Sequence, residues 1–181
     1  MEKGIIIAGF GGQGILFLGK TIAHAAMLSG KEVTWFPSYG AEMRGGTANC
    51  TVIISDELIG SPVAGNVDIL IVFNEASLKK FSHRLKKDGL LFYDSSVIKE
   101  TINSGIATPA TRIAAEDGNP RGANMVMLGA FIAKAGILNE EDIFKTLEEI
   151  IPSSRNKLVE INKRLIRRGI EYFENKKSHS K

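Results

Sequence analysis

Apolar and polar positions follow two different periods along the chain, and their succession predicts an α/β protein. Short runs rich in apolar and β-branched residues are typical of strands, and they occupy 5–8, 32–36, 47–54, 67–73 and 90–93. Longer segments with apolar residues at helical spacing predict helices, and they occupy 13–29, 75–85, 124–135, 139–151 and 153–175. Residues 94–122 contain Pro109 and the Asn119–Gly122 turn signal, and they predict no clear element.

The order of these segments predicts the architecture. Residues 5–36 form a βαβ unit with Gly30 as a helix stop, which favours a parallel sheet with a right-handed crossover. The run 67–73 is apolar except for Asp68, as expected of a central strand covered on both faces. We therefore expect one Rossmann-like α/β domain over residues 1–175, with a mainly parallel sheet and helices on both faces. Residues 176–181 would form a frayed basic tail.

Composition narrows the class of protein. The chain has 181 residues, 44% of them hydrophobic, and a net charge of +3 with the excess concentrated near the C-terminus, which gives no nucleic-acid footprint. No apolar run approaches the roughly 18 residues of a membrane span, and no leader pattern is present, so we expect a cytoplasmic protein that binds no membrane. Cys50 is the only cysteine, and the three histidines lack metal-ligand spacing. We expect Cys50 to be buried, and no metal or cysteine-ligated cluster in this chain.

The most informative motif is Gly9-Phe10-Gly11-Gly12-Gln13-Gly14, which lies between the first strand and the first helix. Backbone N–H groups at a helix start can hold an anion, and glycines let a phosphate approach the backbone closely. The same glycines would also serve a tight turn whose only purpose is close packing of strand and helix. The motif alone leaves both interpretations open.

Two nucleotide-binding classes are disfavoured. An NAD or flavin site of the Rossmann type needs an acidic residue at the end of the second strand, but the chain there reads Trp35–Ser38, and Glu42 follows only beyond a proline. The letters of a Walker motif occur at 14–21, but their intervening residues are apolar and lie inside the first predicted helix. A stand-alone NAD- or flavin-binding oxidoreductase therefore remains only as the alternative function.

Three segments taken together point to a family. Gly9–Gly14, Ser38–Ala48 and Asn124–Ala130 closely resemble, in order and spacing, the gamma subunit of 2-oxoacid:ferredoxin oxidoreductases, and the resemblance covers nearly the whole chain. Residues 44–52 look most like the 2-oxoglutarate branch, with branched-chain, pyruvate and indolepyruvate enzymes as alternatives. Ala41 stands where many members have proline, which is a small departure.

The resemblance implies a multisubunit enzyme that decarboxylates a 2-oxoacid on thiamine diphosphate with Mg²⁺, forms an acyl-CoA, and passes electrons through iron–sulfur clusters to ferredoxin. This chain has no Gly-Asp-Gly motif for thiamine diphosphate and too few cysteines for a cluster. Both reaction centres are therefore expected in alpha and beta partner subunits, with a ferredoxin-like delta subunit where present. We expect this chain to hold no catalytic residue and no firmly bound cofactor, and to be inactive alone.

The expected contribution of this chain is accessory. Arg44 could clamp a phosphate or carboxylate, such as one of coenzyme A, or instead pair with Glu42 or with an acid of a partner. Tyr39 could stack on a base, although packing against a partner is favoured, and Asn124 could cap the late helix or contact a ligand. A purely structural subunit and a homodimer of the isolated chain are further alternatives. The candidates for anion or coenzyme A binding are Gly9, Gly11, Gly12, Gln13, Gly14 and Arg44, and those for interface or ligand contact are Tyr39, Glu42 and Asn124.

Overall fold

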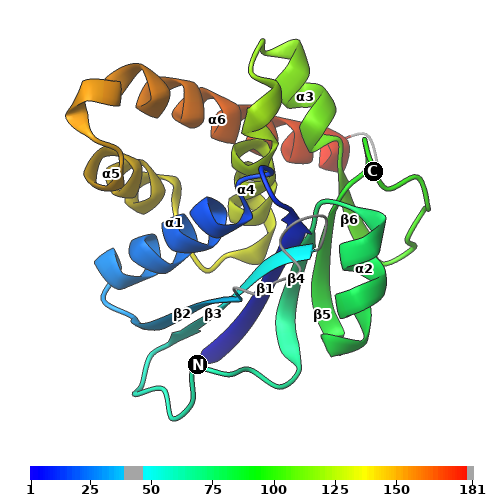
Figure 1. The fold of residues 1–181 in the computed structure, drawn as a ribbon, viewed down its shortest axis with the longest axis vertical. Coiled ribbons are helices and arrows are strands. Elements are labelled where there is room, and N and C mark those ends of the chain that lie inside the picture. Colours follow the sequence, from blue (N-terminus) through cyan, green and yellow to red (C-terminus); the bar gives the residue numbers. More distant parts are fainter. Residues whose placement is uncertain (39–46, 179–181) are drawn as a thin grey trace.

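A computed structural model describes residues 1–38 and 47–178 of the chain (Figure 1). Its strands form one six-stranded sheet in the order β2-β3-β1-β4-β5-β6. The strands are β1 (Glu2–Phe10), β2 (Glu32–Ser38), β3 (Thr47–Ser55), β4 (Val67–Val72), β5 (Leu85–Asp94) and β6 (Gly105–Thr108). The α-helices are α1 (Ile15–Leu28), α2 (Glu75–Phe81), α3 (Ala110–Glu116), α4 (Ala123–Ala135), α5 (Glu140–Ile150) and α6 (Asn156–Ser178).

The sheet is mainly parallel, as expected, but one antiparallel strand is inserted near its edge. β1, β4, β5 and β6 pair in parallel, whereas β3 runs antiparallel between β1 and β2. The first two strands of the predicted βαβ unit therefore share a direction but do not pair with each other. At the carboxyl edge of β1, Phe10 lies opposite Thr47, and Ser38 lies opposite Asn49 one strand further out.

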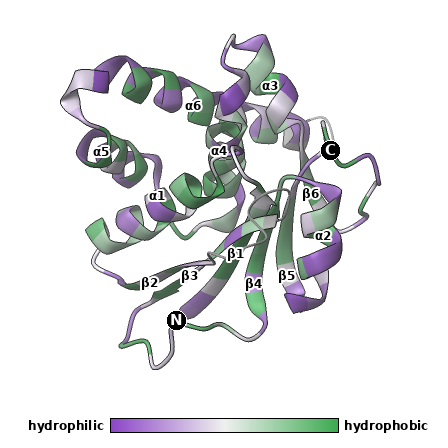
Figure 2. Ribbon diagram, in the orientation of Figure 1, coloured by the Kyte–Doolittle hydropathy of each residue, from purple (hydrophilic) through white to green (hydrophobic). Residues whose placement is uncertain are grey.

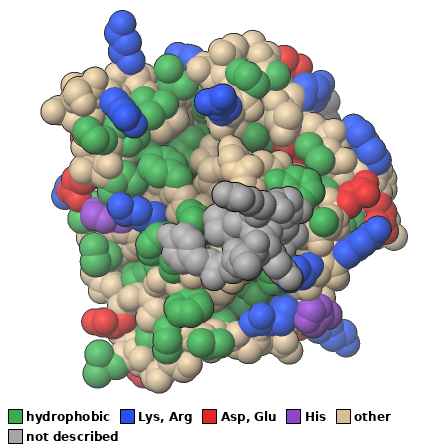
Figure 3. Space-filling view, in the orientation of Figure 1, with side chains coloured by type: hydrophobic (Ala, Val, Ile, Leu, Met, Phe, Trp, Pro, Cys, Tyr) green, Lys and Arg blue, Asp and Glu red, His purple; other side chains and the backbone are tan. Residues whose placement is uncertain are grey.

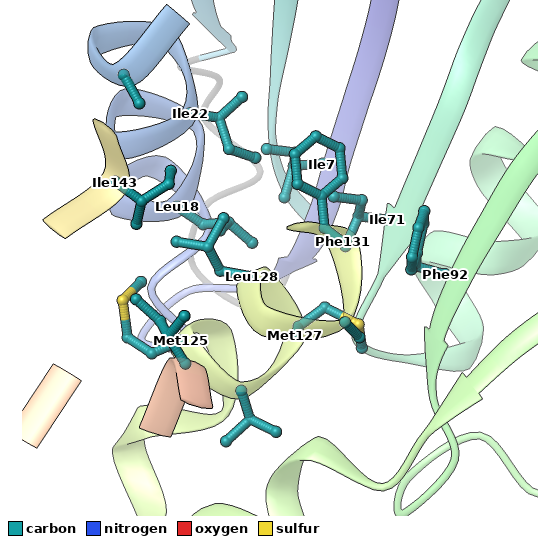
Figure 4. Packing of buried hydrophobic residues seen from close by; sticks show 14 of the residues in the cluster. Ile7, Leu18, Ile22, Ile71, Phe92, Met125, Met127, Leu128, Phe131 and Ile143 are labelled. Atoms are coloured by element: carbon teal, nitrogen blue, oxygen red, sulfur yellow. The ribbon is translucent and has the colours of Figure 1, made fainter. Parts of the chain in front are cut away.

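Helices cover both faces of the sheet, as expected, but unequally. The larger core lies between the sheet and α1, α3 and α4, with α5 packed on α1 and α6 on α4 (Figures 1 and 2). Figure 4 shows Leu18 and Leu128 directed from these helices toward the sheet, where Phe131 lies 5.9 Å from Phe92 between ring centroids. On the other face, α2 covers a smaller cluster that contains Leu70 and Val72.

The central strand β4 confirms the interpretation of the apolar run. Its residues are buried except for Asp68, whose carboxylate accepts from the Gly4 N–H at 3.0 Å and pairs with Lys3 and Lys86. Burial alone would raise the pKa of Asp68, but the hydrogen bonds from Gly4 and Lys86 outweigh it and hold the pKa below its usual value. Asp68, the one polar residue in this apolar strand, is therefore a charged carboxylate whose partners lie near the start of the strand.

The structure corrects the predicted helix over 75–85. α2 ends at Phe81, a short 3₁₀ turn follows, and Leu85 already pairs with Val67 as the first residue of β5. The register then shifts so that Ile69 faces Leu90, which places residues 86–89, between the predicted helix and the predicted strand, inside an irregular strand. A basic, glycine-containing segment is typical of a turn, and only pairing with β4 makes it a strand.

Other boundaries agree more closely. Gly30 and Gly136 have φ values of 77° and 64° at the ends of α1 and α4, as expected of helix stops. Asn139 caps α5, because its side chain accepts from the Asp142 N–H at 2.8 Å. α6 continues to Ser178, so the start of the segment expected as a frayed tail is helical, and 179–181 lie outside the described residues.

Candidate functional site

The glycine turn joins the carboxyl end of β1 to α1. Gly12 and Gly14 adopt φ values of 91° and 73°, and the Gln13 N–H donates to the Phe10 carbonyl at 3.2 Å. Gly14 is the N-cap residue of α1, and no side chain caps the helix. The first helical bond runs from the Leu18 N–H to the Gly14 carbonyl, so the three preceding N–H groups have no acceptor within the helix. This end of α1 therefore has the backbone donors and the dipole that favour an anion.

Two of the glycines are required by packing. A Cβ atom at Gly9 would lie 2.6 Å from Ile15 Cδ1 and 2.7 Å from Gln13 Oε1. A Cβ atom at Gly14 would overlap the side-chain amide of Asn124. By contrast, a Cβ atom at Gly12 would meet nothing within 4 Å, and Gly11 and Gly12 are both exposed. The packing interpretation therefore holds for Gly9 and Gly14, and Gly11 and Gly12 are the part of the turn that a ligand can approach.

Gln13 connects this turn to the start of α2. Its Oε1 accepts from the Phe10 N–H at 2.6 Å and from Asn74 Nδ2 at 3.3 Å, while its Nε2 donates to the Phe73 carbonyl at 3.5 Å. Asn74 in turn accepts from the Ser77 N–H and caps α2. The Gln13 amide is thus engaged by the protein itself, and its contact with a ligand stays a prediction.

Asn124 does not cap α4, so that expectation was wrong. The N-cap residue is Gly122, and Asn124 lies one position inside the helix with only 6% of its surface exposed. Its Nδ2 donates to the Gly14 carbonyl at 3.2 Å, and its Oδ1 accepts from the Met125 N–H at 3.0 Å. Asn124 therefore holds the first turn of α4 against the glycine turn, a contact between distant segments that no local pattern indicates.

The second loop begins and ends beside the glycine turn. Ser38 ends β2 and Thr47 begins β3, at the same edge of the sheet as Phe10. The residues that flank the two loops therefore lie at the same carboxyl edge of the sheet. The candidates Tyr39, Glu42 and Arg44 lie outside the described residues.

The structure also bears on both nucleotide-binding alternatives. Lys20 and Thr21 lie within α1, where Lys20 is exposed and the Thr21 hydroxyl donates to the Phe17 carbonyl at 2.8 Å, so the Walker letters form no P-loop. In a Rossmann dinucleotide site, the strand beside β1 carries the acid that binds ribose. Here antiparallel β3 occupies that place and separates the end of β2 from the glycine turn.

Cys50 is buried as expected. It is fully inaccessible at the contact of β3 with α1, and burial raises the pKa of its thiol to about 12. The thiol is therefore protonated and unreactive at neutral pH. Residues 1–38 and 47–178 contain no cluster of three or more His, Cys, Asp or Glu that could hold a metal ion. No helix in these ranges is long and apolar enough to cross a bilayer.

Sequence reasoning missed a cavity of about 670 Å³ that begins at Gly14 and Asn124. Its far wall is one face of α6, which presents Leu158, Asn162 and Leu165 at helical spacing. Figure 3 shows hydrophobic side chains gathered in the region of α1 and α6, with basic side chains around them. The sequence signal for this cavity was Asn162, a polar residue on the apolar face of α6. The residues that line the cavity opposite Asn162 come from distant segments, and only the fold shows that they lie nearby.

Comparison with known proteins identifies the family. Residues 4–172 match the family model described as pyruvate ferredoxin/flavodoxin oxidoreductase. The chain belongs to this family. It is 38% identical to the ketoisovalerate oxidoreductase subunit VorA of Methanothermobacter marburgensis over 94% of this chain, and it spans only 36% of that relative. It is 34% identical to the 2-oxoglutarate synthase subunit KorC of Archaeoglobus fulgidus, over 94% of this chain and 87% of that relative.

Solved structures of this family have the same fold. A keto/oxoacid ferredoxin oxidoreductase gamma subunit from Geobacter sulfurreducens is 30% identical, with a TM-score of 0.82 over 96% of this chain and 99% of that chain. A 2-oxoglutarate:ferredoxin oxidoreductase from Magnetococcus marinus, solved with 2-oxoglutarate, coenzyme A and succinyl-CoA bound, is 25% identical with a TM-score of 0.84. This chain covers 31% of that one. The resemblance to gamma subunits is confirmed.

Proposed function

We propose that this chain is the gamma subunit of a cytoplasmic 2-oxoacid:ferredoxin oxidoreductase that converts a 2-oxoacid and coenzyme A into acyl-CoA and CO₂. Its alpha and beta partners, with a ferredoxin-like subunit where present, would hold thiamine diphosphate, Mg²⁺ and the iron–sulfur clusters that deliver electrons to ferredoxin. Family membership over residues 4–172 supports the subunit role. The chain alone would be inactive, because no thiamine diphosphate motif or cluster-forming cysteine set occurs in it.

Within such a complex, the carboxyl edge of the sheet would face the partners and help to bind coenzyme A. The observation that carries this proposal is the set of open N–H groups at the start of α1, next to exposed Gly11 and Gly12. The loop containing Arg44 begins and ends at the same edge. A phosphate group would accept hydrogen bonds from the helix end and a bidentate contact from Arg44, and both favour an anion.

The test is Arg44→Ala in the assembled complex, with the rate measured as a function of coenzyme A concentration. Loss of a charge-assisted contact of about 1.5–3 kcal/mol raises the Michaelis constant for coenzyme A by roughly tenfold or more. The turnover number at saturating coenzyme A should change little, because no reacting atom contacts Arg44 in this proposal. Arg112→Ala, at an exposed arginine on α3, is the matched control.

Two outcomes would contradict the coenzyme A role. Unchanged coenzyme A kinetics in the Arg44→Ala complex would remove Arg44 from the site. Failure of Arg44→Ala to assemble, with normal coenzyme A kinetics in whatever complex does form, would instead favour the purely structural subunit.

We further propose 2-oxoglutarate as the substrate, from the resemblance of residues 44–52 to that branch. Relatives named as 2-oxoglutarate synthase subunits are 34–35% identical to this chain, and the ketoisovalerate relatives are 36–38% identical. The branched-chain oxoacid is therefore the competitor. Comparison of kcat/KM for the two substrates in the purified complex decides between them, and a preference for the branched-chain oxoacid would contradict this assignment.

A further inference from the structure

The cavity beside the glycine turn has the size and walls of a small-molecule site. Its volume is about 670 Å³, within the roughly 300–1,000 Å³ common for ligand pockets. The walls are mainly apolar, and Phe17 of α1 contributes an aromatic ring opposite the face of α6 that carries Leu158. Such walls suit the flat or aliphatic body of an organic molecule.

Asn162 is the least satisfied polar side chain in this wall. It is 6% exposed, lines the cavity, and forms no hydrogen bond with any residue of the described ranges. Its amide is not among the fully enclosed polar atoms without a partner, so it opens onto the cavity. Amides with so little exposed surface are almost always paired. A ligand with adjacent donor and acceptor atoms would supply the missing partner.

Two arginines give the cavity its charge. Arg121, after α3, and Arg155, before α6, both line it and are exposed. Neither forms an ion pair within the part of the chain that the structure describes, whereas nearby Arg164 is paired with Asp117 at 2.8 Å. Two uncompensated guanidinium groups at an apolar cavity favour an anionic ligand, and phosphate suits their planar fork.

We propose that this cavity binds an adenosine phosphate. The adenine edge would pair with the Asn162 amide, as asparagine does with adenine in other complexes, and the base would lie against Phe17. Arg121 and Arg155 would hold the phosphate groups. The site differs from the turn at Gly11 and Gly12, although it adjoins the turn through Gly14.

This ligand chemistry has two sources, which are the nucleotide half of coenzyme A and a free adenine nucleotide. If the source is coenzyme A, the inference rests on the proposed function and extends it, because the cavity would anchor the end of the molecule remote from the thiol. If the source is a free nucleotide, the cavity is a separate regulatory site.

Calorimetric titration of the full chain tests the proposal, with adenosine 3′,5′-bisphosphate, coenzyme A, ADP and ribose 5-phosphate as ligands. We expect saturable binding of the adenosine phosphates and at least tenfold weaker binding of ribose 5-phosphate, which lacks the base. Preference for adenosine 3′,5′-bisphosphate and coenzyme A over ADP identifies coenzyme A as the source, and the opposite preference identifies a free nucleotide.

Two variants locate the site. Asn162→Leu removes the amide from an apolar face, and Arg121→Gln combined with Arg155→Gln removes the charge. Each should weaken binding at least tenfold, and the double variant should also reduce its salt dependence, while Arg112→Gln should leave binding unchanged. Circular dichroism confirms that each variant is folded.

The inference is overturned if no adenosine phosphate binds saturably at millimolar concentration, or if both cavity variants bind as the unmodified chain does. These results are separable from the test of Arg44. If no adenosine phosphate binds in the cavity but Arg44→Ala still raises the Michaelis constant for coenzyme A, only this inference is overturned. If adenosine phosphates bind in the cavity but Arg44→Ala leaves the coenzyme A kinetics unchanged, only the proposed role of the glycine turn and Arg44 is overturned.

Discussion

Gly129 of α4 and Gly169 of α6 lie face to face where the two helices cross. A Cβ atom at Gly169 would fall inside the contact distance of the Val126 carbonyl oxygen and 3.1 Å from Gly129 Cα. A Cβ atom at Gly129 would likewise overlap the Ile166 carbonyl oxygen. This close crossing fixes the position of α4, whose first turn carries Asn124 and supports both the glycine turn and the cavity.

Gly169→Ala should therefore destabilise the protein although alanine favours helices. Overpacking against backbone atoms costs about 1–3 kcal/mol, and we expect a net loss in that range from urea unfolding. Gly60→Ala, where a Cβ atom would meet nothing within 4 Å, is the control and should have little effect. A stabilised Gly169→Ala variant, as expected for an exposed helical glycine, would show that the helices cross less closely.

Substitutions at Gly12 and Gly14 should differ in cost. Both residues have positive φ, which costs an alanine about 1–2 kcal/mol. Only Gly14 also faces a side chain, since its Cβ atom would displace the Asn124 amide from the Gly14 carbonyl. We expect Gly14→Ala to lower the free energy of unfolding by clearly more than Gly12→Ala does. Equal losses in urea unfolding would contradict the contact between Asn124 and the turn.

Gln13→Ala should destabilise the protein before any ligand is considered. The change leaves the Phe10 N–H and the Asn74 amide without their shared acceptor, and because the first bond is exposed and the second only part-buried, we expect a loss of about 0.5–1.5 kcal/mol. Lys20→Ala, at an exposed position of α1, is the control and should cost little. If thermal and urea unfolding show no loss for Gln13→Ala, then the Gln13 amide does not hold the turn to α2.

The pair Asp117–Arg164 predicts a pH dependence of stability. The Arg164 guanidinium holds the pKa of Asp117 below its usual value, and Asp117 is only 7% exposed. A carboxylate with a lowered folded-state pKa stabilises the protein above its unfolded pKa of about 3.9, and this contribution is lost as pH falls through the folded-state pKa. Arg164→Gln should thus be less stable than the unmodified chain at pH 7.

The stability difference between Arg164→Gln and the unmodified chain should begin to shrink in urea unfolding below about pH 4, where the carboxyl group of Asp117 takes up a proton in the unfolded chain, and it should vanish once the pH has fallen through the lowered folded-state pKa of Asp117. Arg112→Gln, which loses only a 3.9 Å pair with Glu116, is the matched control and should show no such trend. A difference that stays constant between pH 7 and pH 3 would mean that Arg164 acts through packing alone.

The sequence predicted what depends on local pattern. The apolar run 67–73 and the helix stop at Gly30 depend on short-range chemistry, and the structure confirms both. The insertion of β3 between β1 and β2 depends on pairing between strands, which no local period indicates. The same holds for residues 86–89, which join a strand only because β4 lies alongside them.

The candidate site likewise has one part that local sequence pattern predicts and another part that depends on contacts between distant segments. The glycine turn follows from its spacing between strand and helix, and its position at the end of β1 was predicted. The contact of Asn124 with Gly14 and the cavity lined by Asn162 depend on the crossing of α4 and α6. Since Gly129 and Gly169 look like ordinary helical glycines in the sequence, that crossing could not be read from it.

The central claim is that this chain works as a subunit of a 2-oxoacid:ferredoxin oxidoreductase. The most direct measurement is mild affinity purification of the chain from its native cells, followed by native mass spectrometry and an assay of ferredoxin reduction. We predict co-purification with chains that contain thiamine diphosphate and iron–sulfur clusters, and reduction of ferredoxin that requires both 2-oxoacid and coenzyme A. Recovery of the chain alone or as a homodimer, without such activity, would contradict the claim.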